Sequence, residues 1–216
     1  MKKELTIHES KNAIDFGKYA NLETLNVTFN KEHFNLNKLV NLKHLTIWNY
    51  EGEDLSILES LTNIEELSFY DAKFKTLAGV DNLKKLKRLV LERCKKLTTI
   101  HPIVNLQETL TILEIRHCKL LNEYNNIASL TNLTDLYLIA CGDVENANFL
   151  DNLKSLKYAS IDINILDGQV EKLLDKPIRF KNYKHFNHKN TLKIKIKTNI
   201  GNFLERNGEL LTGQRI

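Results

Sequence analysis

The stretch that decides the fold is LKRLVLERC at residues 86–94. Two later phrases, LTILEIRHC at 110–118 and LTDLYLIAC at 133–141, repeat its leucine spacing and its final cysteine. Four more phrases fall into the same register: LETLNVTFN from residue 22, LKHLTIWNY from 42, IEELSFYDA from 64 and LKYASIDIN from 156. The seven copies begin 20 to 24 residues apart, and a partial copy, ELTIHES, begins at residue 4. Such a period predicts a stack of similar units.

Each phrase has the alternation expected of a short strand. Its fourth and sixth residues, such as Leu89 and Leu91, are apolar and would point to one side, while the residues between them would point to the other. A further leucine lies three or four residues before six of the seven phrases, as Leu83 does here, and would lie on a return segment packed over the strands. Because one unit can bury its leucines only against its neighbours, the pattern predicts a solenoid with a parallel sheet.

The pattern L-x-x-L-x-L-x-x-N/C resembles that of leucine-rich repeats, and the chain resembles bacterial proteins with internalin-like or SDS22-like repeats. The resemblance implies an α/β leucine-rich-repeat solenoid: a curved parallel β-sheet of about eight coils, with helical or 3-10 return segments on the convex side. We assign residues 1–190 to the solenoid with its capping segments, and residues 191–216 to a basic C-terminal extension. Two departures affect the expected local geometry, Ala159 in the last phrase and an extra residue between Leu106 and Leu110.

The three cysteines, Cys94, Cys118 and Cys141, occupy the ninth position of their phrases, where the chain should turn inward after the strand. They would then form a buried ladder on adjacent coils. Neighbouring strands lie about 4.8 Å apart, too far for the thiols to share a metal ion at zinc–sulfur distances of about 2.3 Å. We therefore predict a structural role for the cysteines, and no metal or other cofactor.

Composition narrows the class of protein. The chain is 42% apolar, contains no run of about 20 apolar residues, and follows its basic start with Glu4, His8 and Glu9 instead of an apolar stretch. An odd number of cysteines favours a reducing compartment. We expect a cytoplasmic protein that does not enter membranes. Motifs for phosphate, dinucleotide or zinc-protease chemistry do not occur in the sequence, so we expect a protein that is not an enzyme.

The outward residues of the phrases define a candidate binding surface. Positions three, five, seven and eight should form columns across adjacent strands. They contain an aromatic N-terminal zone, a charged centre and an acidic, aromatic C-terminal zone, and Trp, Tyr and Arg are the commonest interface hot spots. The alternative is a solvated face whose side chains pair with each other, Arg88 with Glu92 or Glu114 with Arg116. The candidate protein-binding residues are His44, Trp48, Tyr70, Arg88, Glu92, Arg93, Glu114, Arg116, His117, Asp135, Tyr137, Tyr158 and Asp162.

The sequence favours a protein as the partner on the concave face, and a monomer when unbound. Resemblance to small bacterial repeat proteins suggests an immunity-type or antitoxin-type protein that occludes a bacterial toxin. A regulatory adaptor and an effector that binds a host protein are the alternatives. The abundance of Lys, Asn and Ile is typical of an AT-rich bacterial genome.

The C-terminal segment differs in charge. Residues 1–175 contain 21 lysines and arginines against 25 acidic residues, whereas residues 176–216 contain 10 against 2. PIRF at 177–180 should form one more strand, and TLKIKIKT at 191–198 alternates apolar and basic residues like a strand. Nucleic-acid binding by this segment is a second, less favoured hypothesis, because the whole chain has a net charge of only +4. His185 and His188 are too few, and on opposite sides of an extended segment, to predict a metal site.

Overall fold

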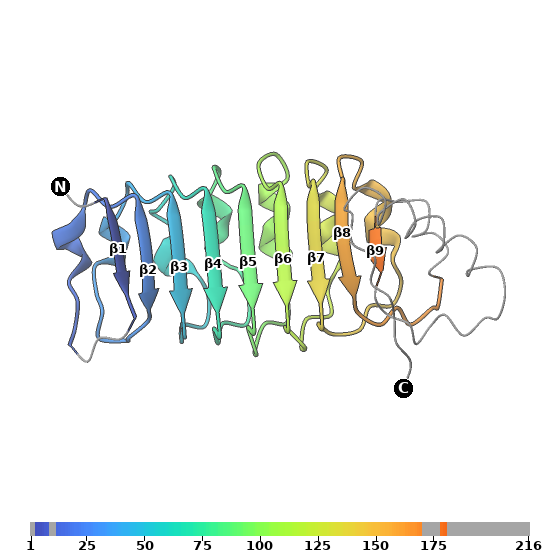
Figure 1. The fold of residues 1–216 in the computed structure, drawn as a ribbon, viewed down its shortest axis with the longest axis horizontal. Helices are drawn as coiled ribbons and strands as arrows, with labels where there is room; N and C mark the ends of the chain where they lie inside the picture. Colours follow the sequence, from blue (N-terminus) through green and yellow to red (C-terminus); the bar gives the residue numbers. More distant parts are fainter. Residues whose placement is uncertain (1–2, 9–11, 170–177, 181–216) are drawn as a thin grey trace, which may run out of the picture.

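The computed structural model describes residues 3–8, 12–169 and 178–180. Nine strands form one parallel sheet in sequence order (Figure 1). The predicted solenoid is confirmed, including the partial first copy and a strand formed by residues of the PIRF segment. The strands are β1 (Glu4–Ile7), β2 (Thr24–Thr28), β3 (His44–Trp48), β4 (Glu66–Tyr70), β5 (Arg88–Glu92), β6 (Ile112–Arg116), β7 (Asp135–Ile139), β8 (Tyr158–Asp162) and β9 (Ile178–Phe180).

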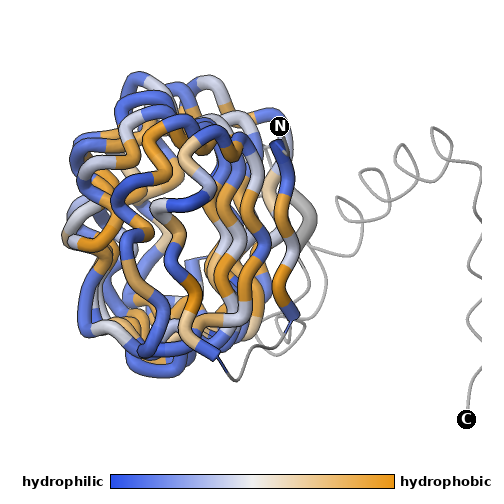
Figure 2. The backbone as a smooth tube through the Cα atoms, turned by 90° about the vertical axis from the view of Figure 1, so that its left-hand side faces the viewer, coloured by the Kyte–Doolittle hydropathy of each residue, from blue (hydrophilic) through white to orange (hydrophobic). Residues whose placement is uncertain are grey.

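Short 3-10 helices cover the other side of the core, as predicted for the return segments (Figure 1). Viewed along its long axis, the described chain is a stack of superposed coils (Figure 2). Among the described residues, no helix is long and apolar enough to cross a bilayer. The 3-10 helices are η1 (Phe16–Tyr19), η2 (Leu36–Lys38), η3 (Ser56–Leu58), η4 (Val80–Asn82), η5 (His101–Leu106), η6 (Asn125–Ser129) and η7 (Asn148–Asn152).

The core lies between the sheet and the 3-10 helices. The fourth and sixth residues of the phrases, such as Leu89 and Leu91, are buried there, and so are return-segment leucines such as Leu83. Ala159 is also fully buried, and β8 pairs with both β7 and β9 despite this small side chain. The strand that we expected to be weakened is therefore an ordinary member of the sheet.

The extra residue after Leu106 is accommodated in one turn. In most coils the first leucine of the phrase donates its N–H to a carbonyl three residues earlier, as Leu86 does to Leu83 at 2.9 Å. Leu110 instead donates to Leu106, four residues earlier, also at 2.9 Å. The inserted residue widens one 3-10 turn into an α-type turn, and the register of β5 with β6 is unchanged.

The chain leaves the five strands β3 to β7 in an unusual conformation at the eighth position of the phrase. Asn49, Asp71, Arg93, His117 and Ala140 all have φ between 51° and 57°, in the left-handed region. Their N–H groups still donate to a carbonyl of the next strand, as Arg93 does to Arg116 at 2.9 Å. This conformation directs the ninth residue into the core, although it favours Asn, Asp or His over residues such as Arg and Ala.

Three sequence predictions fall outside the described residues. They are the TLKIKIKT strand, the His185 and His188 pair, and the boundary at residue 190. These remain predictions from the sequence.

Candidate functional site

The candidate site is the face of the sheet that points away from the 3-10 helices. We call it the open face and define it as positions three, five, seven and eight of the phrases, with the matching residues of the first coil. The strand register aligns these positions as the sequence predicts; for example, Trp48 pairs with Tyr70 and Glu92 with Arg116. Most predicted site residues are partly exposed on this face. His44, Arg93 and His117 are exposed, and Glu114 is buried.

Two aromatic rings meet at the N-terminal part of the open face. Trp48 on β3 stacks on Tyr70 on β4, with ring centroids 5.3 Å apart and planes 15° apart. His44, which we expected in the same cluster, is four residues earlier on β3, and that separation is about 13 Å along a strand. Its Nδ1 instead lies 3.8 Å from the Glu66 carboxylate. The aromatic cluster therefore consists of Trp48 and Tyr70 alone.

A buried carboxylate organises the centre of the open face. Glu114 on β6 is only 6% exposed, and its two oxygens accept hydrogen bonds from Arg88 on β5, at 2.5 Å, and from Arg116, at 2.6 Å. The pairing of Glu114 with Arg116 is the one given by the alternative interpretation, in which the side chains of the face pair with each other. Arg88 pairs with Glu114 and not with Glu92, because its long side chain reaches diagonally across to the next strand. A carboxylate can be buried here because charged donors satisfy it.

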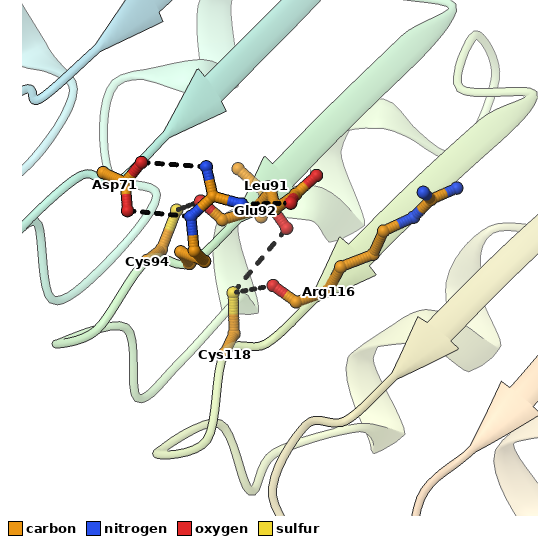
Figure 3. A network of polar contacts seen from close by, with 7 residues as sticks. Asp71, Leu91, Glu92, Cys94, Arg116 and Cys118 are labelled. Carbon is orange, nitrogen blue, oxygen red and sulfur yellow. Dashed lines mark hydrogen bonds and ion pairs between the residues drawn. The ribbon is translucent and has the colours of Figure 1, made fainter.

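Arg93 forms a second charged cluster with Asp71 and Glu92, both of which are labelled in Figure 3. Its guanidinium makes a bidentate pair with Asp71, at 2.8 and 2.9 Å, and also contacts the Glu92 carboxylate. The hydrogen bonds from Arg93 lower the pKa of Asp71, and the same contact raises the pKa of Arg93. Asp71 was not among our candidate residues. The signal was present, because opposite charges at position eight of consecutive phrases must lie side by side.

The centre continues into the C-terminal part of the open face. The Arg116 guanidinium lies 5.4 Å from the centroid of the Tyr137 ring, and Tyr137 packs on Tyr158 of β8 with centroids 5.3 Å apart. Partial burial, and then the nearby Tyr158, Asp135 and Glu114, raise the pKa of Tyr137. Side chains from β5 to β8 thus form one continuous network, whereas the sequence suggested separate zones.

The remaining candidates lie at the edges of this network. The carboxylate of Asp135 accepts a hydrogen bond from the hydroxyl of the adjacent Thr134 at 2.7 Å. Asp162 is half-buried and has no ion pair with a described residue. His117 is exposed in the left-handed region, with its backbone N–H donating to Ile139 at 2.8 Å.

The cysteines lie behind the charged centre and bind backbone. Cys118 is fully buried, and its thiol donates to the carbonyls of Arg116, at 3.4 Å, and Leu91, at 3.7 Å (Figure 3). Cys141 makes the equivalent bonds one coil later, but it is half-buried where we expected full burial. Contact with Cys94 and burial raise the pKa of Cys118, and burial raises the pKa of Cys141 to about 12. These thiols donate to backbone carbonyls at the turns after β5, β6 and β7, in keeping with the structural role that we predicted.

The described residues contain no group of three or more His, Cys, Asp or Glu side chains arranged to hold a metal ion. On the open face the carboxylates at the centre are instead occupied by arginines. The open face presents aromatic rings and a hydrogen-bonded network of charged side chains. The inner strands that carry them are each hydrogen-bonded to a neighbouring strand on both sides. Such a face can recognise another surface.

Comparison with known proteins identifies the architecture. No protein-family profile and no curated protein matches the chain. An internalin from Listeria monocytogenes superposes with a TM-score of 0.68 at 25% identity, over 85% of this chain and 57% of that one. A leucine-rich-repeat protein of Leptospira interrogans gives a TM-score of 0.64 at 20% identity, over 85% of this chain and 49% of that one. The chain thus spans about half the length of both. It is a leucine-rich-repeat solenoid, structurally similar to leucine-rich-repeat proteins of bacteria.

Proposed function

We propose that the chain is a non-enzymatic scaffold whose open face binds a protein partner. One observation supports this proposal: four aromatic side chains lie on one face of the sheet, Trp48, Tyr70, Tyr137 and Tyr158. The same face contains arginines whose positions are fixed by ion pairs with carboxylates. Aromatic and arginine side chains dominate binding energy at protein interfaces. Side chains positioned in advance lose little further conformational entropy on binding.

The size of the open face suits such an interface. Eight strands spaced about 4.8 Å apart span about 34 Å, and five residues along each strand span about 16 Å. The resulting footprint of about 500 Å² is of the same order as the roughly 800 Å² that each partner buries in a standard interface. This estimate leaves out the residues at position eight of the phrases. A partner that also contacts them would bury an area closer to that of a standard interface.

For the role of this binding we favour an immunity-type or antitoxin-type protein of the bacterial cytoplasm that occludes a toxin. A broad, rigid face without an organised reaction centre suits occlusion. A regulatory adaptor, or an effector that binds a host protein, would use the same face. A neighbouring toxin gene would favour neutralisation, and a phosphatase gene or secretion context would favour the alternatives.

The first prediction tests the face itself. We expect the triple variant Trp48→Ala, Tyr70→Ala, Tyr137→Ala to lose the partner that co-purifies with the wild-type chain from its native cell, because its apolar anchors are gone. The measurement is affinity capture with the partner identified by mass spectrometry, followed by titration of that purified partner.

The matched control truncates three exposed apolar side chains on the return segments: Tyr19→Ala, Phe34→Ala, Leu120→Ala. This control should retain the partner. If the open-face variant binds as tightly as the control while its circular dichroism spectrum shows an intact fold, the partner does not use the open face.

A further inference from the structure

The charges of the solenoid are distributed unevenly between its open face and the rest of its surface. Residues 3–8 and 12–169 contain 18 lysines and arginines and 22 acidic residues. Within these residues the open face contains three arginines, no lysine and seven acidic residues; beyond them, Arg179 on β9 pairs in register with Ser160 of the face. The remaining 15 lysines and 15 acidic residues balance each other elsewhere. The open face therefore carries the whole net charge of this part of the chain, −4. Its acidic residues are Glu4, Glu66, Asp71, Glu92, Glu114, Asp135 and Asp162.

The three arginines of the open face are all committed to its centre. Arg88 and Arg116 bind Glu114, and Arg93 binds Asp71 and Glu92. Among residues 3–8 and 12–169, this leaves the carboxylates toward the ends of the face without an ion pair to an arginine. Such a face attracts cationic surfaces and repels anionic ones.

The C-terminal end combines two of these carboxylates with aromatic rings. Asp135 binds only the neutral hydroxyl of Thr134, and Asp162 has no ion pair among the described residues. Between them lie the half-buried rings of Tyr137 and Tyr158. Carboxylates bind ammonium and guanidinium groups, and the faces of tyrosine rings also attract cations. The two carboxylates and the Tyr158 ring thus favour lysine or arginine, whereas Arg116 already lies over the Tyr137 ring.

We infer that the partner presents a cationic protein surface, rich in lysine and arginine, and that this surface contacts the Asp135, Tyr137, Tyr158 and Asp162 end of the open face. The inference rests on the proposed function and names the chemistry of the partner. A basic partner would replace the water around these carboxylates with its own cations. Charge attraction would also steer its approach.

The test uses two labelled peptides, one alternating lysine with alanine and one alternating glutamate with alanine. Their binding to the full chain is measured by fluorescence anisotropy. We expect the lysine peptide to bind, more weakly at about 200 mM than at about 50 mM salt because screening shortens the range of the attraction. The glutamate peptide should not bind. Equal binding of the two peptides would overturn the inference.

Two charge-neutralising variants locate the contact. Asp135→Asn with Asp162→Asn should weaken binding of the lysine peptide by about fivefold, as expected for the loss of two partly exposed ion pairs. Glu59→Gln with Glu145→Gln removes the same charge from return segments and should change binding by less than about twofold, since screening isolates distant surface charges. An equal loss in both variants would mean that only net charge matters, and the proposed contact would be wrong.

Two further outcomes are distinguishable. If the wild-type chain does not bind the lysine peptide but the variant Lys193→Gln, Lys195→Gln, Lys197→Gln does, the basic C-terminal segment of the chain itself occupies the face. That result would overturn the inference of an external basic partner. If Asp135→Asn with Asp162→Asn leaves binding of the natural partner unchanged while the open-face alanine variant abolishes it, the proposed function stands and this inference fails.

Discussion

Glu114 shows how one residue can organise a whole surface. Its carboxylate is buried on the solvent side of the sheet because Arg88 and Arg116 satisfy both oxygens. Arg116 in turn lies against Tyr137. The position of at least three neighbouring side chains therefore depends on this one carboxylate.

The second prediction follows from this arrangement. We expect Glu114→Gln to lower the free energy of unfolding by about 1–2 kcal/mol, below the usual cost of breaking a buried ion pair because both arginines remain in contact with water. Urea denaturation measures the change. Glu66→Gln, a neutralisation on the same face at an exposed position, should cost less than about 0.5 kcal/mol. Equal losses would show that Glu114 is not an organising residue.

At the scale of the element, backbone conformation limits what each turn between a strand and its 3-10 helix can hold. Gly79 precedes η4 with a φ of 103°. A Cβ atom placed there would lie 2.3 Å from the backbone carbonyl of Leu55 in the preceding coil. The close stacking of coils at this turn therefore needs glycine.

The third prediction separates this clash from backbone strain alone. Gly79→Ala should lower the free energy of unfolding by about 3 kcal/mol or more. The alanine would have a strained positive φ, and the backbone of Leu55 would also have to move away from its Cβ atom. Gly168→Ala is the control, since Gly168 also has a positive φ, 67°, but nothing lies within 4 Å of its Cβ position. It should cost about 1 kcal/mol, the penalty for the left-handed region alone. The difference in urea midpoints measures the clash, and equal midpoints would rule it out.

The strands are also connected by charges at the second position of the phrase, along one edge of the open face. Glu23 binds both Lys3, at 2.5 Å, and Lys43, at 2.8 Å, and Glu65 binds Lys87 at 2.6 Å. Hydrogen bonds from Lys3 and Lys43 lower the pKa of Glu23 from its ordinary value of 4.5 to about 2. These ion pairs connect consecutive coils and favour the observed alignment of their strands.

The fourth prediction concerns the pH dependence of these ion pairs. Because the pKa of Glu23 is lower in the folded than in the unfolded chain, its stabilisation is complete above about pH 4.5 and is lost as the pH falls toward about 2. The melting temperature of the wild type should therefore exceed that of Glu23→Gln at neutral pH, and the difference should shrink through this window. High salt should reduce the difference at neutral pH, since the pairs are exposed. A difference independent of pH would contradict the assignment.

On the scale of the whole molecule, the repeat separates two tasks. The inward columns of leucines bury every coil against its neighbours, so the outward columns are free to vary without loss of the fold. That freedom explains how all three arginines of residues 3–8 and 12–169 lie on one face while the lysines of these residues lie on the others. The same separation is why similarity to other leucine-rich-repeat proteins identifies the architecture and leaves the partner to be tested.

Much of this organisation could be predicted before any coordinates. The period, the inward leucines and the columns of the open face follow from side-chain alternation along each strand. The cysteines could be assigned a structural role because three consecutive strands span about 9.6 Å, too far for all three thiols to share one metal ion. The effects of Ala159 and of the insertion after Leu106 could not be predicted, because they depend on how the neighbouring coils absorb a change in volume or length.

The sequence by itself determined the solenoid, the register of its strands and which residues face outward, because these are consequences of a period of two along a strand and about 22 along the chain. Only the tertiary structure decided which outward residues touch. Arg88, for example, could reach Glu92 or Glu114. Long side chains span more than one neighbour, so their partners depend on burial and competing charges from adjacent coils.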